Sequence, residues 1–485
     1  PGEAPGMMAL EIAMDEMPEK LGMDPVELRV LNDTQVDPEK PQRRFSQRHL
    51  VECMRMGAER FGWSRRSARA AQTRDGRWLL GLGMAAAFRN NLTQKSAARV
   101  RLDRQGRITV ETDMTDIGTG SYTIIAQTAA EVMGVGMEQV TVQLGDSEFP
   151  VSCGSGGQWG GNNSTAGVYA ACMALRETVA RRLGMDPSRA EFAGGRVSVP
   201  GGRSVPLGQA AQQGELAGED AIEYGDLAKT YQQSTFGAHF VEVAVDPFTA
   251  EVRVRRMLAV CAAGRILNPK TARSQVIGAM TMGAGAALME HLAVDKRYGF
   301  FVNHDLASYE VPVHADIPHQ EVAFLGEADP ISSPMKAKGV GELGICGAAA
   351  AVANGIYNAT GVRVRGYPVT LDKLLPGMRD VAWIGNWVRC ASSARTRPTS
   401  AALLVTRSFL NALPRWNRTV GYSKPSRLWI SLSGQPQLTS HATSASRLLR
   451  RPSRCSVASA HLPSSLAGAV SFQSSRESAA VMAGS

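Results

Sequence analysis

Three glycine-rich segments, each directly before a helical pattern, are the parts of this sequence best suited to bind a ligand. They are residues 116–120 (DIGTG), 154–165 (GSGGQWGGNNST) and 338–344 (KGVGELG). Glycine lets the backbone approach a ligand closely, and the free N–H groups at the start of a helix attract phosphate. Each segment alone is more typical of a tight turn than of a binding site, and none has P-loop or Rossmann spacing. Together they indicate a large polyanionic ligand of the dinucleotide type, held from several sides.

Glu342, within the third segment, is the acid best placed for proton transfer. Gly341 before it and Leu343-Gly344 after it leave room for a substrate, and an Ala/Val-rich stretch follows. Apolar surroundings favour the protonated carboxyl, which suits a general base that works near neutral pH. An acid in the first turn of a helix is also stabilised by the helix dipole. Two interpretations of Glu342 therefore remain open, a general base and a helix-start residue.

The cysteine and histidine residues exclude several kinds of metal site in this chain. The seven cysteines are widely separated and form no CxxC motif. Iron–sulfur clusters, structural zinc and a disulfide framework are not expected, and no residue is assigned as a metal ligand. If the chain takes part in electron transfer, another subunit carries the clusters. Five histidines lack a zinc-ligand spacing and are interpreted as surface or core residues: His239, His291, His304, His314 and His319.

The net charge of +9 over 485 residues is unevenly distributed. Residues 377–485 contain 13 Arg and one Lys against Asp380 and Glu477, a net charge of +12, which leaves −3 on the first 376 residues. The body of the chain therefore gives no reason to expect a nucleic-acid partner. Its apolar stretches, such as residues 277–289, are too short and too glycine-rich for a membrane span.

The basic segment 377–485 differs in kind from the body. It is rich in Ser and Arg, nearly free of acids, and has no sustained helical or strand periodicity. Three interpretations are open: an out-of-frame or read-through product of a GC-rich gene, a disordered extension, and an RNA-binding tail. The third lacks the basic–aromatic repeats that would stack bases. Function is therefore sought in residues 1–376.

The alternation of helical and strand patterns predicts an α+β fold of mixed sheets and helices. Asp24-Pro25 begins a short helix that ends near Asn32, and Ser46 is expected to cap the next one. Gly106 and the Asp246-Pro247 turn predict two hairpins. The expected strands are 98–103, 107–113, 240–245 and 251–260, and the expected longer helices are 121–132, 166–182, 271–289 and 348–357.

Four motifs in matching order identify a family resemblance. They are residues 1–6 (PGEAPG), 118–120 (GTG), 263–269 (AGRILNP) and 338–342 (KGVGE). The chain over residues 1–375 resembles the molybdenum-binding subunit of the xanthine dehydrogenase/aldehyde oxidase family, and within it the bacterial periplasmic aldehyde oxidoreductases. The resemblance implies that family's fold. It also implies molybdenum-dependent oxidation of aldehydes to carboxylic acids with water as the oxygen source.

The resemblance also implies a cofactor and the residues that bind it. The cofactor would be molybdopterin cytosine dinucleotide, with Glu342 as general base and with Arg89 steadying the substrate carbonyl. Arg89 could equally be a surface residue at the end of a strand. The residues implied in cofactor binding are Gly118, Thr119, Gly120, Gly161, Asn162, Arg265, Ile266, Leu267, Asn268, Pro269, Lys270, Thr271, Gln275, Lys338, Gly339, Val340 and Gly341.

Further expectations about the assembly follow from the resemblance. A [2Fe–2S] subunit and a FAD subunit would complete a heterotrimer, exported to the periplasm with a signal on a partner, with a cytoplasmic location as the alternative. Residues 1–62 would end a first molybdopterin-binding domain, 63–376 would form a second, and 377–485 would be the tail. The family subunit has a further N-terminal half, so the chain alone is expected to be inactive. Hydroxylation of an N-heterocycle such as isoquinoline, or a non-catalytic remnant, are the alternative functions.

Overall fold

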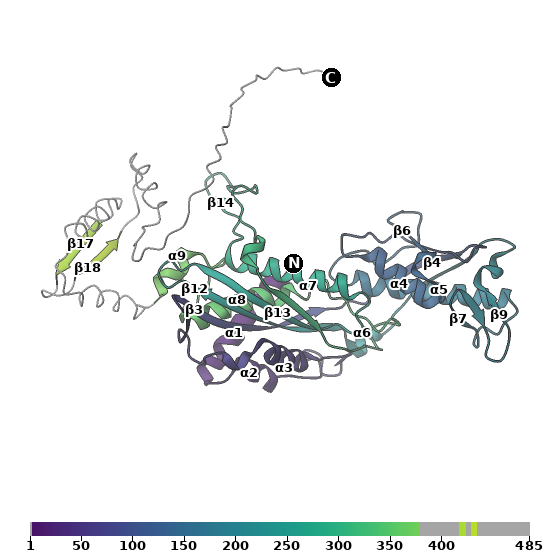
Figure 1. The fold of residues 1–485 in the computed structure, drawn as a ribbon, viewed down its shortest axis with the longest axis horizontal. Coiled ribbons are helices and arrows are strands. Elements are labelled where there is room, and N and C mark those ends of the chain that lie inside the picture. Colours follow the sequence, from purple (N-terminus) through teal and green to yellow (C-terminus); the bar gives the residue numbers. More distant parts are fainter. Residues whose placement is uncertain (1, 379–416, 423–427, 434–485) are drawn as a thin grey trace, which may run out of the picture. The chain divides into compact units, whose positions relative to one another are not determined.

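The computed structural model describes residues 2–378, 417–422 and 428–433 of the chain. It divides into two units, Pro1–Ala382 and Trp383–Ser485. In the second unit, β17 (Asn417–Tyr422) pairs antiparallel with β18 (Leu428–Ser433). The interpretations of residues 377–485 as disordered, out of frame or RNA-binding fall almost entirely outside the described residues. The first unit contains all the predicted site residues and is shown in Figure 1.

A five-stranded sheet with the order β16-β13-β12-β3-β2 forms the centre of the first unit. The long strands β3, β12 and β13 pair antiparallel, and β16 joins β13 in parallel. Since successive side chains of a strand point to opposite faces, each long strand supplies apolar residues to two cores. The strand bounds are β2 (Thr73–Asp75), β3 (Trp78–Asn90), β12 (Ser234–Val245), β13 (Val252–Ala262) and β16 (Gln320–Phe324).

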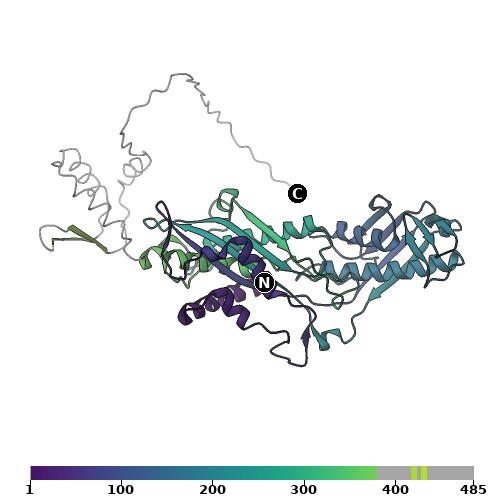
Figure 2. The same cartoon turned by 60° about the horizontal axis from the view of Figure 1, so that its bottom comes forward.

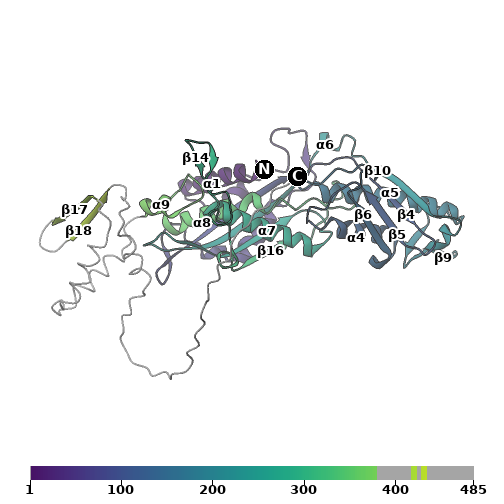
Figure 3. The same ribbon diagram turned by 90° about the horizontal axis from the view of Figure 1, so that it is seen from above.

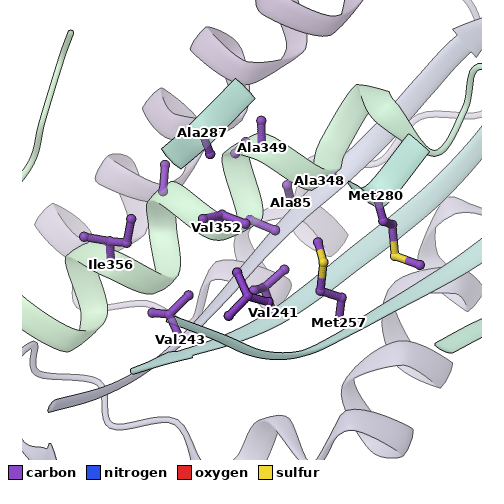
Figure 4. Close-up of a cluster of buried hydrophobic side chains, with 14 of the residues drawn as sticks. Ala85, Val241, Val243, Met257, Met280, Ala287, Ala348, Ala349, Val352 and Ile356 are labelled. Carbon is purple, nitrogen blue, oxygen red and sulfur yellow. The ribbon is translucent and has the colours of Figure 1, made fainter. Parts of the chain in front are cut away.

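Three helices cover one face of this sheet: α1 (Glu3–Leu21), α7 (Pro269–Leu288) and α8 (Ile345–Thr360). Val241, Val243 and Met257 of the sheet pack there against Met280 of α7 and the alanines and Val352 of α8 (Figure 4). Glycine makes the close approach of α8 to β3 possible. A Cβ at Gly83 would lie 2.1 Å from the carbonyl oxygen of Ala351. This tight seam fixes the start of α8 relative to the end of β3.

The opposite face of the five-stranded sheet is covered by α2 (Pro25–Leu31) and α3 (Leu50–Phe61), drawn in purple below the long strands in Figure 2. Phe236 and Phe240 of β12 are fully buried there, against Met54 and Phe61 of α3. Aromatic and sulfur side chains of this size bury a large apolar area, which anchors both helices to the sheet.

A second sheet, with the order β10-β4-β5-β6, packs against α4 (Ser121–Met133) and α5 (Gly160–Arg182), as Figure 3 shows. The parallel pair β5 and β6 is connected through α4, and antiparallel β4 and β5 form a hairpin. The strands are β4 (Ser96–Leu102), β5 (Ile108–Thr112), β6 (Val140–Leu144) and β10 (Leu216–Ile222), with a small meander of β7 (Glu191–Ala193), β8 (Arg196–Ser198) and β9 (Ser204–Pro206).

The remaining described elements are short. β1 and β11 pair in parallel, and β14 and β15 form a two-stranded antiparallel ribbon between α7 and β16. They are β1 (Arg44–Phe45), α6 (Leu227–Thr230), β11 (Tyr231–Gln232), β14 (Val294–Asp295), β15 (Phe300–Phe301) and α9 (Leu371–Leu374). In the part of the chain that the structure describes, no helix is long and apolar enough to cross a bilayer.

The predicted α+β architecture is confirmed, and so are both hairpins and the four long helices, within a few residues. Asp24 caps α2 through Val26 N–H at 2.8 Å, as predicted. The predicted cap at Ser46 is wrong: α3 begins at Leu50, and the Ser46 hydroxyl donates to buried Asp329 at 2.6 Å. The predicted domain boundary at residue 62 stays a prediction, although α3, which ends there, packs on the same sheet as the segments that follow.

Candidate active site

Glu342 lies where the 338–344 segment leads into α8, at the meeting point of two cavities. The main cleft, of about 320 Å³, separates the start of α5 from the 338–342 backbone and the start of α7. The side cavity, of about 500 Å³, is lined by Glu3, Arg89, one face of α7 and Glu342. The Glu342 side chain is 42% exposed. Its carboxylate is therefore accessible from both cavities.

Arg89, 253 residues away in sequence, holds this carboxylate. It lies near the end of β3 on the α8 face of the sheet and is 6% exposed. Its Nε donates to Glu342 Oε2 at 2.9 Å, Nη2 donates to the same oxygen, and Nη1 donates to Glu3 Oε1. Burial alone would lower the pKa of Arg89, but the hydrogen bonds and charges of Glu342 and Glu3 outweigh it and raise the pKa. The three side chains form a charged cluster at the mouth of the side cavity.

Most of the residues predicted to bind a cofactor meet in the main cleft, although they come from four separate segments of the chain. They are Thr119, Gly161, Asn162, Arg265, Ile266, Leu267, Asn268, Thr271, Gln275, Lys338, Gly339, Val340 and Gly341, together with Glu342. Gly118, Gly120, Pro269 and Lys270 do not line it. Arg89 lies in the side cavity, which shares Gln275, Gly341 and Glu342 with the main cleft.

The 116–120 segment does not present a row of free N–H groups. The Asp116 carboxylate accepts hydrogen bonds from the N–H groups of Gly118, Thr119 and Gly120 at 2.8, 3.0 and 3.3 Å. Burial would raise the pKa of Asp116, but these backbone bonds outweigh it and lower the pKa. Gly120 instead lets the segment pack on α7, since a Cβ there would lie 2.8 Å from Thr271 Cγ2. The segment therefore shapes the cleft, and of the three predicted residues only Thr119 faces it.

The start of α5 carries the clearest sign of a ligand. The sequence predicts a loop to residue 165, yet the helix begins at Gly160, so Gly161 and Asn162 lie in its first turn. Asn162 is 2% exposed, and neither its Oδ1 nor its Nδ2 has a hydrogen-bond partner among the described residues. A buried amide left unpaired is costly, so a group with acceptors and donors is expected in the cleft.

The 265–275 segment brings a second helix start to the same cleft. Asn268 caps α7 by accepting from Lys270 and Thr271 N–H at 3.0 and 3.1 Å. Arg265 forms a two-bonded ion pair with Glu131, at 2.9 and 2.6 Å, and Glu131 raises the pKa of Arg265. Two helix N-termini thus border one cleft, and their dipoles favour an anionic ligand there. The first N–H groups of α7 are already taken by Asn268, and the Arg265 guanidinium by Glu131.

Lys338 contributes backbone rather than charge to the cleft. Its Nζ lies 3.4 Å from Asp329 Oδ2, and the side chains of both residues are buried, at 1% and 0% exposed. Burial lowers the pKa of Lys338, and the neighbouring Asp329 and Glu327 oppose this. The ammonium group is therefore committed to the protein interior, which its place in a glycine-rich segment does not indicate.

Several residues of the site had no role assigned from the sequence, among them Glu3, Gln158 and Cys346. Glu3 shares Arg89 with Glu342. Gln158 lines the main cleft and accepts the Glu342 N–H, and Cys346, buried on α8, lines the side cavity. Glu3 lies in the recognised 1–6 motif and Gln158 in a glycine segment. The sequence did not show that Glu3 and Gln158 lie close to Glu342. For Cys346, no feature of the sequence pointed to the site.

His239 lies on β12 beneath the start of α8 and gives the chain a predicted acid sensitivity. It is 1% exposed, and burial lowers its pKa to about 4, an effect that the nearby backbone of Leu343 opposes only in part. An unfolded histidine protonates near pH 6.5. The unfolded state therefore binds the proton first as the pH falls. We expect the free energy of unfolding to decline between about pH 6.5 and 4, by on the order of 3 kcal/mol from this residue.

Urea unfolding of the purified chain at several pH values measures this decline. His239→Leu removes the titrating group and should flatten the decline relative to the parent chain. His304→Gln, at an exposed position, serves as the matched control and should leave the decline unchanged. Equal pH dependence of the parent chain and His239→Leu would show that His239 does not contribute.

No group of three or more His, Cys, Asp or Glu side chains that could hold a metal ion occurs among residues 2–378. The five cysteines there are free thiols.

Comparison with known proteins identifies the family of the chain. The model of the molybdopterin cofactor-binding domain matches residues 56–318, more than half of the chain. The chain is 69% identical over 381 residues to the aldehyde oxidoreductase molybdenum-binding subunit PaoC of Escherichia coli K12, covering 79% of this chain and 52% of PaoC. It is 29% identical over 393 residues to the xanthine dehydrogenase molybdenum-binding subunit of Escherichia coli O157:H7, covering 76% and 51%. The chain spans about half the length of these curated relatives.

Solved structures show the same fold. The aldehyde oxidoreductase of Desulfovibrio desulfuricans superposes with a TM-score of 0.63 at 26% identity, covering 77% of this chain and 40% of that chain. Quinoline 2-oxidoreductase of Pseudomonas putida gives a TM-score of 0.67 at 24% identity, covering 77% and 52%, and supports the fold alone. The chain therefore belongs to the molybdopterin cofactor-binding domain family and is a homologue of the molybdenum-binding subunits of molybdenum hydroxylases in the xanthine dehydrogenase family.

Proposed function

We propose that this chain contributes the general base and one wall of the cofactor site to a molybdenum-dependent enzyme that oxidises aldehydes to carboxylic acids with water as the oxygen source. The observation that carries the proposal is the Glu342 carboxylate, accessible from both cavities and held by Arg89. Because the chain spans about half of its relatives, the whole activity requires the remaining half of such a subunit.

The residues of the main cleft fit a pterin dinucleotide. The unpaired buried amide of Asn162 and the helix start of α5 suit phosphates and heterocyclic donors and acceptors. The guanidinium of Arg265, although paired with Glu131, borders the same cleft. We propose molybdopterin cytosine dinucleotide as the form bound, with Gln275 and the 338–341 backbone nearest its reactive end. When bound, this cofactor supplies the two-electron redox chemistry.

The chain's own residues move the proton and orient the site. Oxidation of an aldehyde with water gives a carboxylic acid, two protons and two electrons. Arg89 engages Oε2 of Glu342, so we assign Oε1 as the atom that takes up the proton from the attacking water oxygen. Arg89 fixes that carboxylate, and although its charge is shared by Glu342 and Glu3, we propose that its guanidinium also donates to the developing negative charge of a carbonyl oxygen in the side cavity.

The charge of Arg89 favours aldehydes over N-heterocycles such as isoquinoline as substrates. We propose that an iron–sulfur subunit and a FAD subunit complete the enzyme. A periplasmic location, with the export signal on a partner, remains a proposal that fractionation of the native host would test. A remnant without function predicts neither cofactor nor turnover.

The cofactor assignment is tested in the enzyme assembled with its partner subunits. Asn162→Asp keeps the side-chain shape but places a negative charge in the cleft. We therefore expect the molybdenum content to be lower than in the parent enzyme by about tenfold or more. The parent enzyme should release cytidine monophosphate equimolar with molybdenum on acid hydrolysis. Gln143→Glu adds the same charge on the exposed face of β6 and should retain full content. Undiminished molybdenum in Asn162→Asp, or no cytidine nucleotide in the parent, would contradict the assignment.

A further inference from the structure

Gln158 has an unfavourable backbone conformation beside the active site. Its φ is +60°, in the left-handed region, although it is not a glycine. The preceding Gly157 adopts a positive φ at no steric cost, so glycine would have been the relaxed choice here too. Strain of this kind persists where the surroundings enforce it, and its usual location is a functional site. The side chain of Gln158 must therefore supply something that glycine lacks.

The side-chain amide of Gln158 connects three segments of the site. Its Oε1 accepts the N–H of Glu342 at 3.2 Å. Its Nε2 donates to the Thr235 hydroxyl at 2.8 Å and to the Asn90 carbonyl at 3.3 Å. Thr235 in turn donates to the carbonyl of Arg89 at 3.2 Å. One amide, 8% exposed, thus ties the peptide of Glu342 to the strand ends that carry Arg89.

The backbone of Gln158 restrains the same segment from the other side. A Cβ at Gly339 would lie 1.8 Å from the Gln158 carbonyl oxygen, so the two backbones touch. The Gly339 N–H donates to Asn91 Oδ1 at 2.8 Å. The 338–342 segment is therefore held against residue 158 both by backbone contact and by the side-chain amide. The left-handed φ of Gln158 allows its carbonyl oxygen and its side-chain amide to contact the 338–342 segment at the same time.

We infer that Gln158 is a positioning residue, which sets the location of Glu342 relative to Arg89 and the two cavities. This inference rests on the proposed role of Glu342 as general base. Gln158 does not itself move a proton: it holds the peptide from which the base projects. A displacement of about 1 Å at a reacting group costs up to about a hundredfold in rate, so the effect of losing this brace falls on kcat.

Gln232 provides a matched control. It lies two residues before β12, the strand that contains Thr235. Its Nε2 donates to Asn90 Oδ1 at 2.8 Å and to the Ser234 hydroxyl at 3.0 Å. It therefore braces the same strand ends with the same chemistry, and its amide bonds do not involve the 338–344 segment. A general weakening of the strand ends would appear in Gln232→Asn as well, whereas a loss of positioning appears only in Gln158→Asn.

The experiment compares Gln158→Asn, Gln232→Asn and the parent in the assembled enzyme. Asparagine tolerates a positive φ better than glutamine but is one methylene shorter, so it tests the reach of the amide without added strain. Hydrogen exchange of the 338–344 peptide, measured by mass spectrometry with and without cofactor, should be about three- to tenfold faster in Gln158→Asn. At equal molybdenum content, kcat should fall about ten- to a hundredfold with KM within about twofold.

Thr235→Val keeps Gln158 but removes the hydroxyl that orients its amide, and it supports the proposal if its exchange and kcat change in the same direction. If Gln158→Asn does not fold, Thr235→Val tests the positioning role of Gln158 by the same two measurements. Unchanged exchange, faster exchange with unchanged kcat, or an equal effect in Gln232→Asn would each overturn the inference. An active Glu342→Gln enzyme would instead overturn the proposed function, while the exchange result would still show whether Gln158 restrains the segment.

Discussion

Replacing Glu342 by glutamine is expected to lower kcat for aldehyde oxidation by about 10²- to 10⁴-fold, the usual contribution of a general base. Glutamine keeps the shape of the side chain and a carbonyl oxygen that can accept from Arg89, but it cannot take up a proton. The side chain is 42% exposed, so its amide stays hydrated and folding should be little affected. Steady-state kinetics normalised to molybdenum content measures the loss.

Glu16→Gln is the control for this substitution. Glu16 lies on α1 and pairs with Arg365, and it lines neither cavity. The loss of its charge should therefore leave kcat unchanged. Molybdenum and cytidine nucleotide contents of Glu342→Gln should equal those of the parent, because the cofactor contacts of the cleft remain. Turnover at the parent rate in fully loaded Glu342→Gln would remove Glu342 from the reaction.

Replacing Arg89 by methionine is expected to lower kcat/KM for aldehydes by about 10²- to 10³-fold. The substitution removes the cation that holds Glu342 and the positive charge beside the side cavity. It also leaves Glu342 and Glu3 as two neighbouring carboxylates without their shared partner. Their side chains are 42% and 41% exposed and remain hydrated, so the free energy of unfolding should fall by only about 1 kcal/mol. The loss of activity should therefore far exceed the loss of stability.

Arg363→Met is the control that separates a loss of activity from a loss of stability. Arg363 pairs with Asp15, which is 2% exposed, and stacks on Tyr357 of α8, away from both cavities. Its loss should reduce stability by more than Arg89→Met while kcat/KM stays near the parent value. The comparison of an aldehyde with isoquinoline adds a test of substrate class, since the loss in Arg89→Met should be larger for the aldehyde. Equal losses for both substrates would argue against a contact between Arg89 and a carbonyl.

The local features of the fold could be predicted from the sequence because they depend on residues that are neighbours in the chain. Asp24 and Pro25 determine where α2 begins, and Gly106 supplies the positive φ of a hairpin turn. The glycine segments, with Glu342 in one of them, predicted candidate ligand-binding parts of the chain, and each of them contributes at least one residue to the main cleft. The family resemblance added Arg89 and most of the residues that line the main cleft.

The tertiary structure decided which groups of those segments are available to a ligand. Asp116 uses the N–H groups of the first glycine segment, Asp329 takes the ammonium of Lys338, and packing makes Gly160 the start of α5 despite its low helix propensity. The partnerships of Arg89 with Glu342, and of Gln158 with the Glu342 peptide, join residues 253 and 184 positions apart. Sequence determined the elements because caps, turns and alternation act over a few residues. Only the folded chain decided the site, because hydrogen bonds and ion pairs between distant segments depend on how the sheets and helices pack.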